Sequence, residues 1–170
     1  MKEIEEKEFK ESNHAKELSM ETKITVRSIA NWTTGFQKIE TMGDVTIPAN
    51  GTTRLNRGEV IAQAQNGNKL FSGIDGLGSH ATLYIEDAAT RAELGFDDKA
   101  ENRTQQVLNQ ELVDKLFAYK GVSKTFKDKI TECIITNAEK VAIMMMIQKG
   151  NYNDYDKIRY IENYTGHRMK

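Results

Sequence analysis

The hydrophobic pattern of the chain changes its period partway along, and this change constrains the fold more than any other feature. Between residues 22 and 86, short apolar stretches such as Ile24 and Val26 alternate with polar residues, the period of a half-buried strand. From Thr104 onward, apolar residues recur at the three- and four-residue spacing of amphipathic helices. Strand signals followed by helix signals predict an α+β fold: a small antiparallel β module, then a helical module of about three helices.

Turn residues divide the first part into short strands. Pro48 ends one of them, because proline cannot donate a hydrogen bond to a strand ladder, and Asn50-Gly51 is the strongest tight-turn signal in the chain. A glycine-rich loop at 73–78 separates the last two strands. The segments that we expect to form strands are 24–30, 36–41, 45–47, 69–71 and 81–85.

Two short helices are predicted inside the β-rich part. Asn56 has the side chain of a helix N-cap, and Glu59 three residues later predicts a reciprocal arrangement like a capping box, with a helix to about Gln65. Asp87 predicts the start of a second helix, which Gly95 ends.

The second part carries the signals of three helices. The first begins near Thr104 and ends before Gly121. Ser123 is an N-cap for the second, which we expect to continue unbroken to Lys149. Asp154 caps the third helix, and Gly166 closes it.

These patterns divide the chain into four parts. Residues 1–20 are dense in Glu and Lys, with Ile4 and Phe9 among their few large apolar residues, and we expect either a solvated tail or an arm that orders against a partner. Residues 21–95 form the β-rich module with one or two short helices. Residues 96–103 are polar and aperiodic, which predicts a linker, and residues 104–170 form the helical module.

The run Val141–Ile147 is the most informative local feature. Seven consecutive apolar residues cover every face of a helix, and such a helix is buried all round. The run is either wrapped by the neighbouring helices, or one methionine-rich face meets another subunit, because flexible thioethers fit irregular surfaces. The second alternative adds four residues of this run to the two of the arm as candidate protein-interaction residues: Ile4, Phe9, Ile143, Met144, Met146 and Ile147.

The sequence predicts no catalytic residues, no metal site, no cofactor and no small-molecule substrate. The loop Gly73–Gly78 is followed by a strand signal, whereas phosphate loops lead into a helix N-terminus. The adjacent residues Ser79 and His80 point to opposite faces of an extended strand and are poorly placed to act as a hydrolytic pair with Asp75. None of the three histidines has a Cys or His neighbour at metal-ligand spacing.

The net charge and the length of the apolar runs indicate which partners the sequence does not favour. The net charge of −1 does not favour DNA as a partner, and the longest apolar run is too short to cross a bilayer. The single cysteine, Cys133, cannot form an intramolecular disulfide and is expected to be a small core residue.

Four motifs resemble segments of small virion proteins of tailed bacteriophages. Three lie in the β-rich part, and the last resembles the closing helix of such proteins and of head–tail connector adaptors. The motifs are Gly43-Asp44-Val45-Thr46-Ile47-Pro48, Leu55-x-Arg57-x-Glu59-Val60-Ile61, Asn68-x-Leu70-Phe71-x-Gly73 and Lys157-x-x-x-Ile161-Glu162-x-x-Thr165-Gly166. The β-rich part departs from most adaptors, which are helical throughout.

The resemblance implies a non-enzymatic structural or assembly protein, present in many copies in the virion and in the host cytoplasm during synthesis. Its implied partners are capsid or portal proteins and other copies of itself. The alternative is a small regulatory protein that inhibits or sequesters a host protein. A third hypothesis is an enzyme whose pocket lies where the 73–80 loop meets Glu86 or Asp87.

Overall fold

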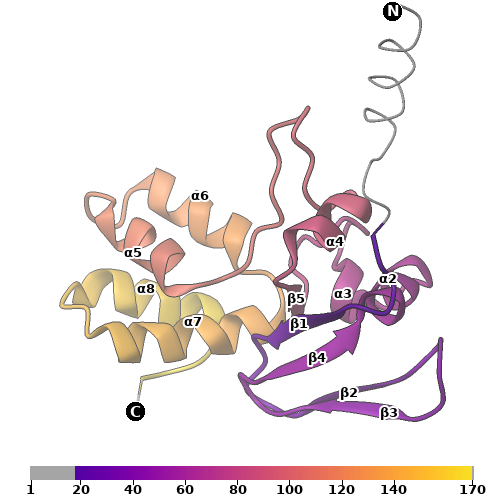
Figure 1. The fold of residues 1–170 in the computed structure, drawn as a ribbon. Coiled ribbons are helices and arrows are strands. Elements are labelled where there is room, and N and C mark those ends of the chain that lie inside the picture. Colours follow the sequence, from indigo (N-terminus) through magenta and orange to yellow (C-terminus); the bar gives the residue numbers. More distant parts are fainter. Residues whose placement is uncertain (1–17, 170) are drawn as a thin grey trace, which may run out of the picture.

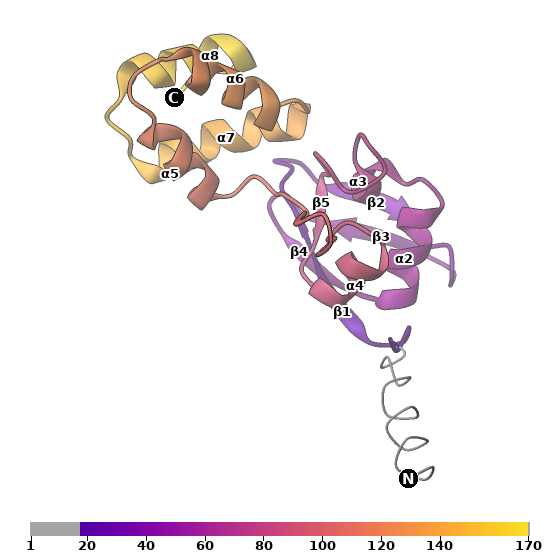
Figure 2. The ribbon, with the colours of Figure 1, turned by 90° about the horizontal axis from the view of Figure 1, so that it is seen from above.

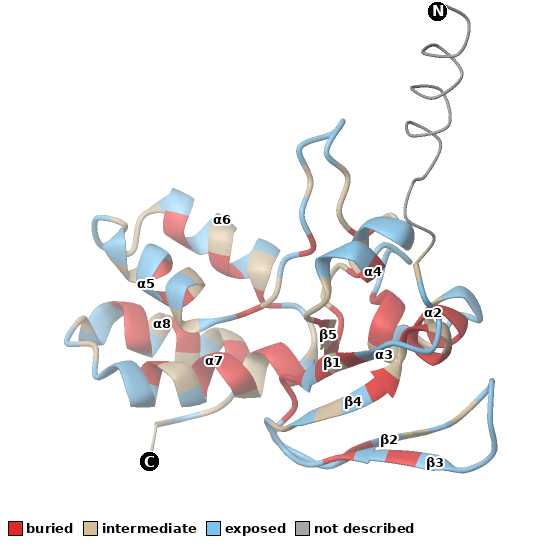
Figure 3. Cartoon of the chain, in the orientation of Figure 1, coloured by how far each residue is buried: buried red, intermediate tan, exposed pale blue. Residues whose placement is uncertain are grey.

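A computed structural model describes residues 18–169, and its described part has two modules that lie side by side (Figures 1 and 2). The first module is mainly strands and short helices, and the second is helical, so the predicted α+β class is confirmed. Each module has its own apolar core, and both modules contain buried residues on their helices or strands (Figure 3).

The β module contains a three-stranded and a two-stranded antiparallel sheet. Strand β1 (Lys23–Ser28) lies between β4 (Thr52–Asn56) and β5 (Leu83–Ile85). Strands β2 (Thr34–Gln37) and β3 (Asp44–Ile47) form a separate hairpin. The predicted alternation holds, because Ile24 and Val26 of β1 are both buried.

Three helices complete the β module. They are α2 (Arg57–Gln65), α3 (Lys69–Ser72) and α4 (Ala88–Glu93). The N-cap of α4 is Asp87, as predicted, and its side chain accepts a hydrogen bond from the Thr90 amide.

Several predictions for the β module were wrong. The sequence analysis missed β4 altogether, and residues 69–71 form the helix α3 rather than a strand, because the Asn68 side chain caps it by accepting from the Leu70 amide. The capping box at α2 does not form, since Asn56 makes no side-chain cap bond. Phe96 was predicted to lie in the linker, but its side chain is buried in the core of the β module.

The helical module has four helices: α5 (Gln110–Ala118), α6 (Lys124–Cys133), α7 (Asn137–Gly150) and α8 (Tyr155–Thr165). The predicted first helix begins six residues later than Thr104, where the Asn109 side chain provides the N-cap. Ser123 and Asp154 cap α6 and α8 as predicted.

The helix predicted from Ser123 to Lys149 is divided in two. Helix α6 ends at Cys133, and Thr136 begins α7 with a complete capping box, in which Thr136 and Glu139 each bond the other residue's amide. The pattern Thr-x-x-Glu was present in the sequence, and it identifies the break.

Candidate interaction site at the junction of the two modules

The two modules touch through a small apolar contact. Ile29 and Ala30 follow β1, and Ala138 is the second residue of α7. Val107 belongs to the connecting segment, residues 104–109, which is neither helix nor strand and links the two modules. Because this cluster is small beside the two main cores, the modules depend on a few further contacts for their relative position.

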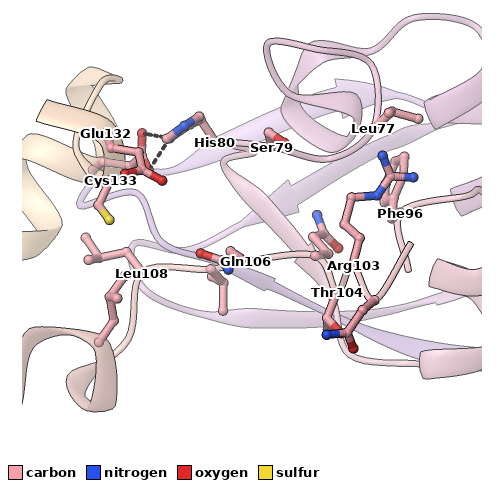
Figure 4. A pocket seen from close by; sticks show the side chains of 15 residues that line it. Leu77, Ser79, His80, Phe96, Arg103, Thr104, Gln106, Leu108, Glu132 and Cys133 are labelled. Carbon is pink, nitrogen blue, oxygen red and sulfur yellow. Dashed lines mark hydrogen bonds and ion pairs between the residues drawn. The ribbon is translucent and has the colours of Figure 1, made fainter. Parts of the chain in front are cut away.

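A hydrogen-bonded contact between His80 and Glu139 joins the modules beside this cluster (Figure 4). His80 Nδ1 lies 2.8 and 2.9 Å from the two carboxylate oxygens of Glu139. Because a carboxylate accepts hydrogen bonds, Nδ1 carries the proton. Glu139 is only 4% exposed and also accepts from the Ile135 and Thr136 amides, so its buried charge has several donors.

The backbone of His80 adopts a left-handed conformation with φ of 59°. This conformation is uncommon for residues other than glycine, asparagine, aspartate and histidine. The loop before it is fixed by Asp75, which accepts hydrogen bonds from the Leu77 amide and from the Ser79 amide and hydroxyl. The loop therefore holds the His80 ring toward α7.

The His80 cavity, lined by residues that include His80, Glu139 and Cys133, has a volume of about 360 Å³. A carboxylate orients the imidazole, as in hydrolytic sites, but the Ser79 hydroxyl donates to Asp75 rather than to His80. Burial raises the pKa of the Cys133 thiol, with Glu132 adding to the rise, so the thiol is protonated at neutral pH and is a weak nucleophile. Neither the Ser79 hydroxyl nor the Cys133 thiol is therefore activated as a nucleophile here, and the His80–Glu139 contact joins the two modules.

The 73–80 loop and Glu86 or Asp87, predicted to meet in an enzymatic pocket, do not share one hollow among the described residues: Ser79 and His80 line the His80 cavity, whereas Glu86 lines a second hollow. Glu86 pairs with Arg27, and Asp87 accepts from Thr90 and Arg57. Burial alone would raise the pKa of Asp87, but the bonds from Thr90 and Arg57 hold it below its usual value. Both carboxylates therefore have structural partners, and neither lines the His80 cavity.

A second hollow lies at the junction of the modules, and we call it the methionine groove. Its volume is about 750 Å³, and its lining comes from β1 and the residue after it, Asn50, β5 and the residue after it, α4, the connecting segment, α5 and α7. The aliphatic and methionine side chains of the lining are Ile29, Val107, Leu108, Ala142, Met145 and Met146, and the other nine residues include Tyr84, Glu86 and Lys149. Met145 is 41% exposed and Met146 is half-buried. The groove thus offers an accessible apolar surface on α7.

The predicted interaction residues divide into three groups. Ile143, Met144 and Ile147 are buried in the helical core, so the wrapped alternative is correct for them and they are not surface residues. Met146 lines the methionine groove. Ile4 and Phe9 lie outside the described residues.

Two exposed apolar features were not predicted from the sequence. Met145 belonged to the predicted run, but only the register of α7 places it at the surface. The other feature is the hairpin tip, residues 38–44, where Ile39 is 48% and Met42 is 96% exposed. Two large apolar residues in a polar turn segment were the available signal.

Neither a metal site nor a membrane span is found in residues 18–169. Within this range, no three His, Cys, Asp or Glu side chains cluster in a way that could hold a metal ion. No helix in the same range has the length and apolar character that crossing a bilayer requires.

Comparison with known proteins gives no relative. No protein-family model matches the chain, and neither the curated proteins nor the solved structures contain a significant match.

Proposed function

We propose that this protein is a non-enzymatic structural or assembly component of a tailed-phage particle, which binds capsid or head–tail neck proteins. It acts in the virion and is present in the host cytoplasm during synthesis. The observation that carries the proposal is the exposure of large apolar side chains on features that face outward: Ile39 and Met42 at the hairpin tip, and Met145 in the methionine groove. Apolar side chains exposed on a projecting turn and in a groove are available for protein–protein contact.

Most apolar residues of the four motifs that resemble phage virion proteins are buried in the fold. Val45, Ile47, Leu55, Val60 and Phe71 are all buried in the core of the β module. Lys157, Ile161 and Thr165 of the last motif are buried in α8. The resemblance therefore concerns residues that build the cores of the two modules.

The polar groups that could do chemistry have structural partners. Asp75 organises its loop, Glu139 caps α7 and holds His80, and Asp87 caps α4. This use of the titratable side chains supports a role in binding rather than catalysis.

The proposal is tested by mass photometry of the full chain, alone and mixed with the capsid and portal proteins encoded beside its gene. We expect complexes whose masses are sums of this chain and a capsid or portal protein. The proposal would be contradicted if the chain did not bind those proteins but formed a one-to-one complex with one host protein from lysate. That result would favour the regulatory alternative.

A further inference from the structure

The hairpin tip is a projecting apolar feature with a fixed conformation. The Lys38 amide donates to the Gly43 carbonyl across the tip, at 2.9 Å. The Glu59 carboxylate of α2 accepts from the Ile39 and Glu40 amides at 2.7 and 2.8 Å. These bonds hold the tip before any partner arrives, and such preorganisation lowers the entropic cost of binding.

The side chains of the tip match the methionine groove in apolar character. Ile39 and Met42 are exposed at the tip, and Met145 and Met146 line the groove beside Ile29. Methionine is flexible and adapts to irregular apolar surfaces, so a Met42 side chain suits a groove lined by two others.

The charges of the two surfaces are complementary. The tip carries one basic residue, Lys38, and two acidic residues, Glu40 and Asp44. The groove lining contains three basic residues and one acidic residue. Arg27 pairs with Glu86, and Arg91 pairs with Asp97, so Lys149 is the basic residue of the lining that has no ion-pair partner among residues 18–169.

One copy cannot fill its own groove with its own tip. Asn50, just after β3, lines the groove, whereas the tip lies at the opposite end of the β2–β3 hairpin (Figure 1). Four residues of strand separate these ends by roughly 13 Å. The sheet register and the Glu59 bonds fix the hairpin in this direction.

We propose that the hairpin tip of one copy inserts into the methionine groove of a second copy. The inference rests on the proposed structural role and names one partner for it. Because two different surfaces of the same chain meet, the contact is heterologous: it closes into a ring if the rotation between copies allows, and otherwise continues as a filament.

The test uses two full-length variants that each lose one side of the contact. Met42→Glu places a charge on the hairpin tip and leaves the methionine groove intact. Met145→Glu places a charge in the groove and leaves the tip intact. Mass photometry and sedimentation velocity should show wild-type oligomers, and self-association at least tenfold weaker for either variant alone. An equimolar mixture of the two should form a one-to-one pair that does not grow, because only one intact contact remains.

Ile74→Glu is the matched control, because Ile74 is 60% exposed and lies on the 73–79 loop, outside both surfaces. It should assemble as the wild type does. Circular dichroism and thermal melts establish that each variant folds.

Several outcomes would overturn the inference. A wild-type chain that stays monomeric at the highest concentration measured would do so, as would variants that assemble normally or a mixture that forms no pair. If the monomeric chain still bound capsid or portal proteins, the proposed function would stand and only the self-contact would be lost. If Met145→Glu abolished that binding, the groove would belong to a virion partner instead of a second copy.

Discussion

Glu59 shows at the residue scale how one carboxylate positions a distant loop. It is buried on α2 and accepts two amide hydrogen bonds from the hairpin tip and one from the Gln63 side chain. Burial alone would raise the pKa of Glu59, but the bonds from Ile39, Gln63 and Glu40 hold it below its usual value. The ionised carboxylate therefore stabilises the folded state.

We predict that Glu59→Gln lowers the free energy of unfolding by about 2 kcal/mol at pH 7, because the amide replaces an acceptor with a donor toward the tip amides. The folded-state pKa is depressed, so this stabilisation is present above the unfolded-state pKa of about 4.3 and is lost as pH falls through the folded-state value. Urea denaturation between pH 7 and pH 3 measures it. Glu93→Gln, at an exposed position on α4, is the control. An equal difference at both pH values would contradict the role of the ionised form.

Position 78 requires glycine for two reasons: its backbone has a positive φ, and neighbouring side chains lie close to its Cα. Its φ is +84°, and an added Cβ would lie 2.6 Å from Gln105 Nε2 and 2.9 Å from Phe96 Cδ2. Gly76 has a similar φ of +76° with open space around it. Comparing alanine at the two positions separates the steric cost from the conformational cost.

We predict that Gly76→Ala costs about 1 kcal/mol of stability, the cost of a left-handed alanine. Gly78→Ala should cost about 2 kcal/mol more, because the neighbouring side chains must move. Thermal and chemical denaturation measure both. Equal losses would show that the contact with Phe96 and Gln105 has no energetic weight.

The local sequence pattern for a capping box was correct at one helix and wrong at another. Asn56 with Glu59 and Thr136 with Glu139 both place a capping side chain three residues before a glutamate. The second pair forms a capping box and the first does not, because Glu59 bonds the hairpin tip instead. That competing contact spans some twenty residues, and no local pattern contains it.

At the element scale, Lys157 joins two helices of the helical module. It is buried on α8, and its Nζ donates to the carbonyl oxygens of Phe117, at 2.7 Å, and Tyr119. These carbonyls lie at the C-terminal end of α5, where helices leave acceptors without intrahelical partners. One buried side chain thus fixes α8 against the end of α5.

We predict that Lys157→Met lowers the free energy of unfolding by about 2 kcal/mol, because methionine fills similar space but leaves both carbonyls without this donor. Guanidinium denaturation measures the loss. Lys120→Met, at an exposed position just after α5, should change stability by less than about 0.5 kcal/mol. A similar loss in the two variants would contradict the capping role.

The helices and strands themselves were predictable to different degrees. Helices α4, α6 and α8 have side-chain caps that the sequence displays, and their starts were predicted. Strand β4 was missed because it follows the Asn50-Gly51 turn directly and only Leu55 is fully buried, so its alternation is short. Helix α3 has four residues, too few for a helical period to show against a strand pattern.

At the scale of the whole molecule, the His80–Glu139 pair sets how the two modules meet. The other contacts at the junction include a small apolar cluster and a long hydrogen bond from Asn50 Nδ2 to Met145 Sδ, so this pair has a large share in the arrangement. The left-handed backbone at residue 80 complicates a change to alanine, but asparagine tolerates that conformation and is too short to reach Glu139.

We predict that His80→Asn leaves both modules folded and loosens their contact. Limited proteolysis should cut the extended connecting segment, residues 104–109, several-fold faster than in the wild type, because opening exposes it. Small-angle scattering should show a larger radius of gyration. His167→Asn, outside the junction, is the control. Unchanged scattering and cleavage would show that the apolar contact alone holds the modules.

The relation between the modules could not be predicted from the sequence. The two periods of the hydrophobic pattern predicted a β module followed by a helical module. The methionine groove, however, is lined by side chains from β1 and α7, which are over a hundred residues apart in the sequence. The exposure of Met145, one residue from buried Met144, depends on the register of α7 against its neighbours. Surfaces of this kind arise only when the modules pack.

The proposed role as a structural part of a phage particle predicts that this chain is present in purified particles. Quantitative mass spectrometry of gradient-purified particles tests it most directly, with a phage whose genome encodes this chain. We predict that peptides of this chain are present at a fixed ratio of several copies per portal ring and remain after high-salt washing. Peptides that are abundant in the infected cell but absent from purified particles would contradict the claim.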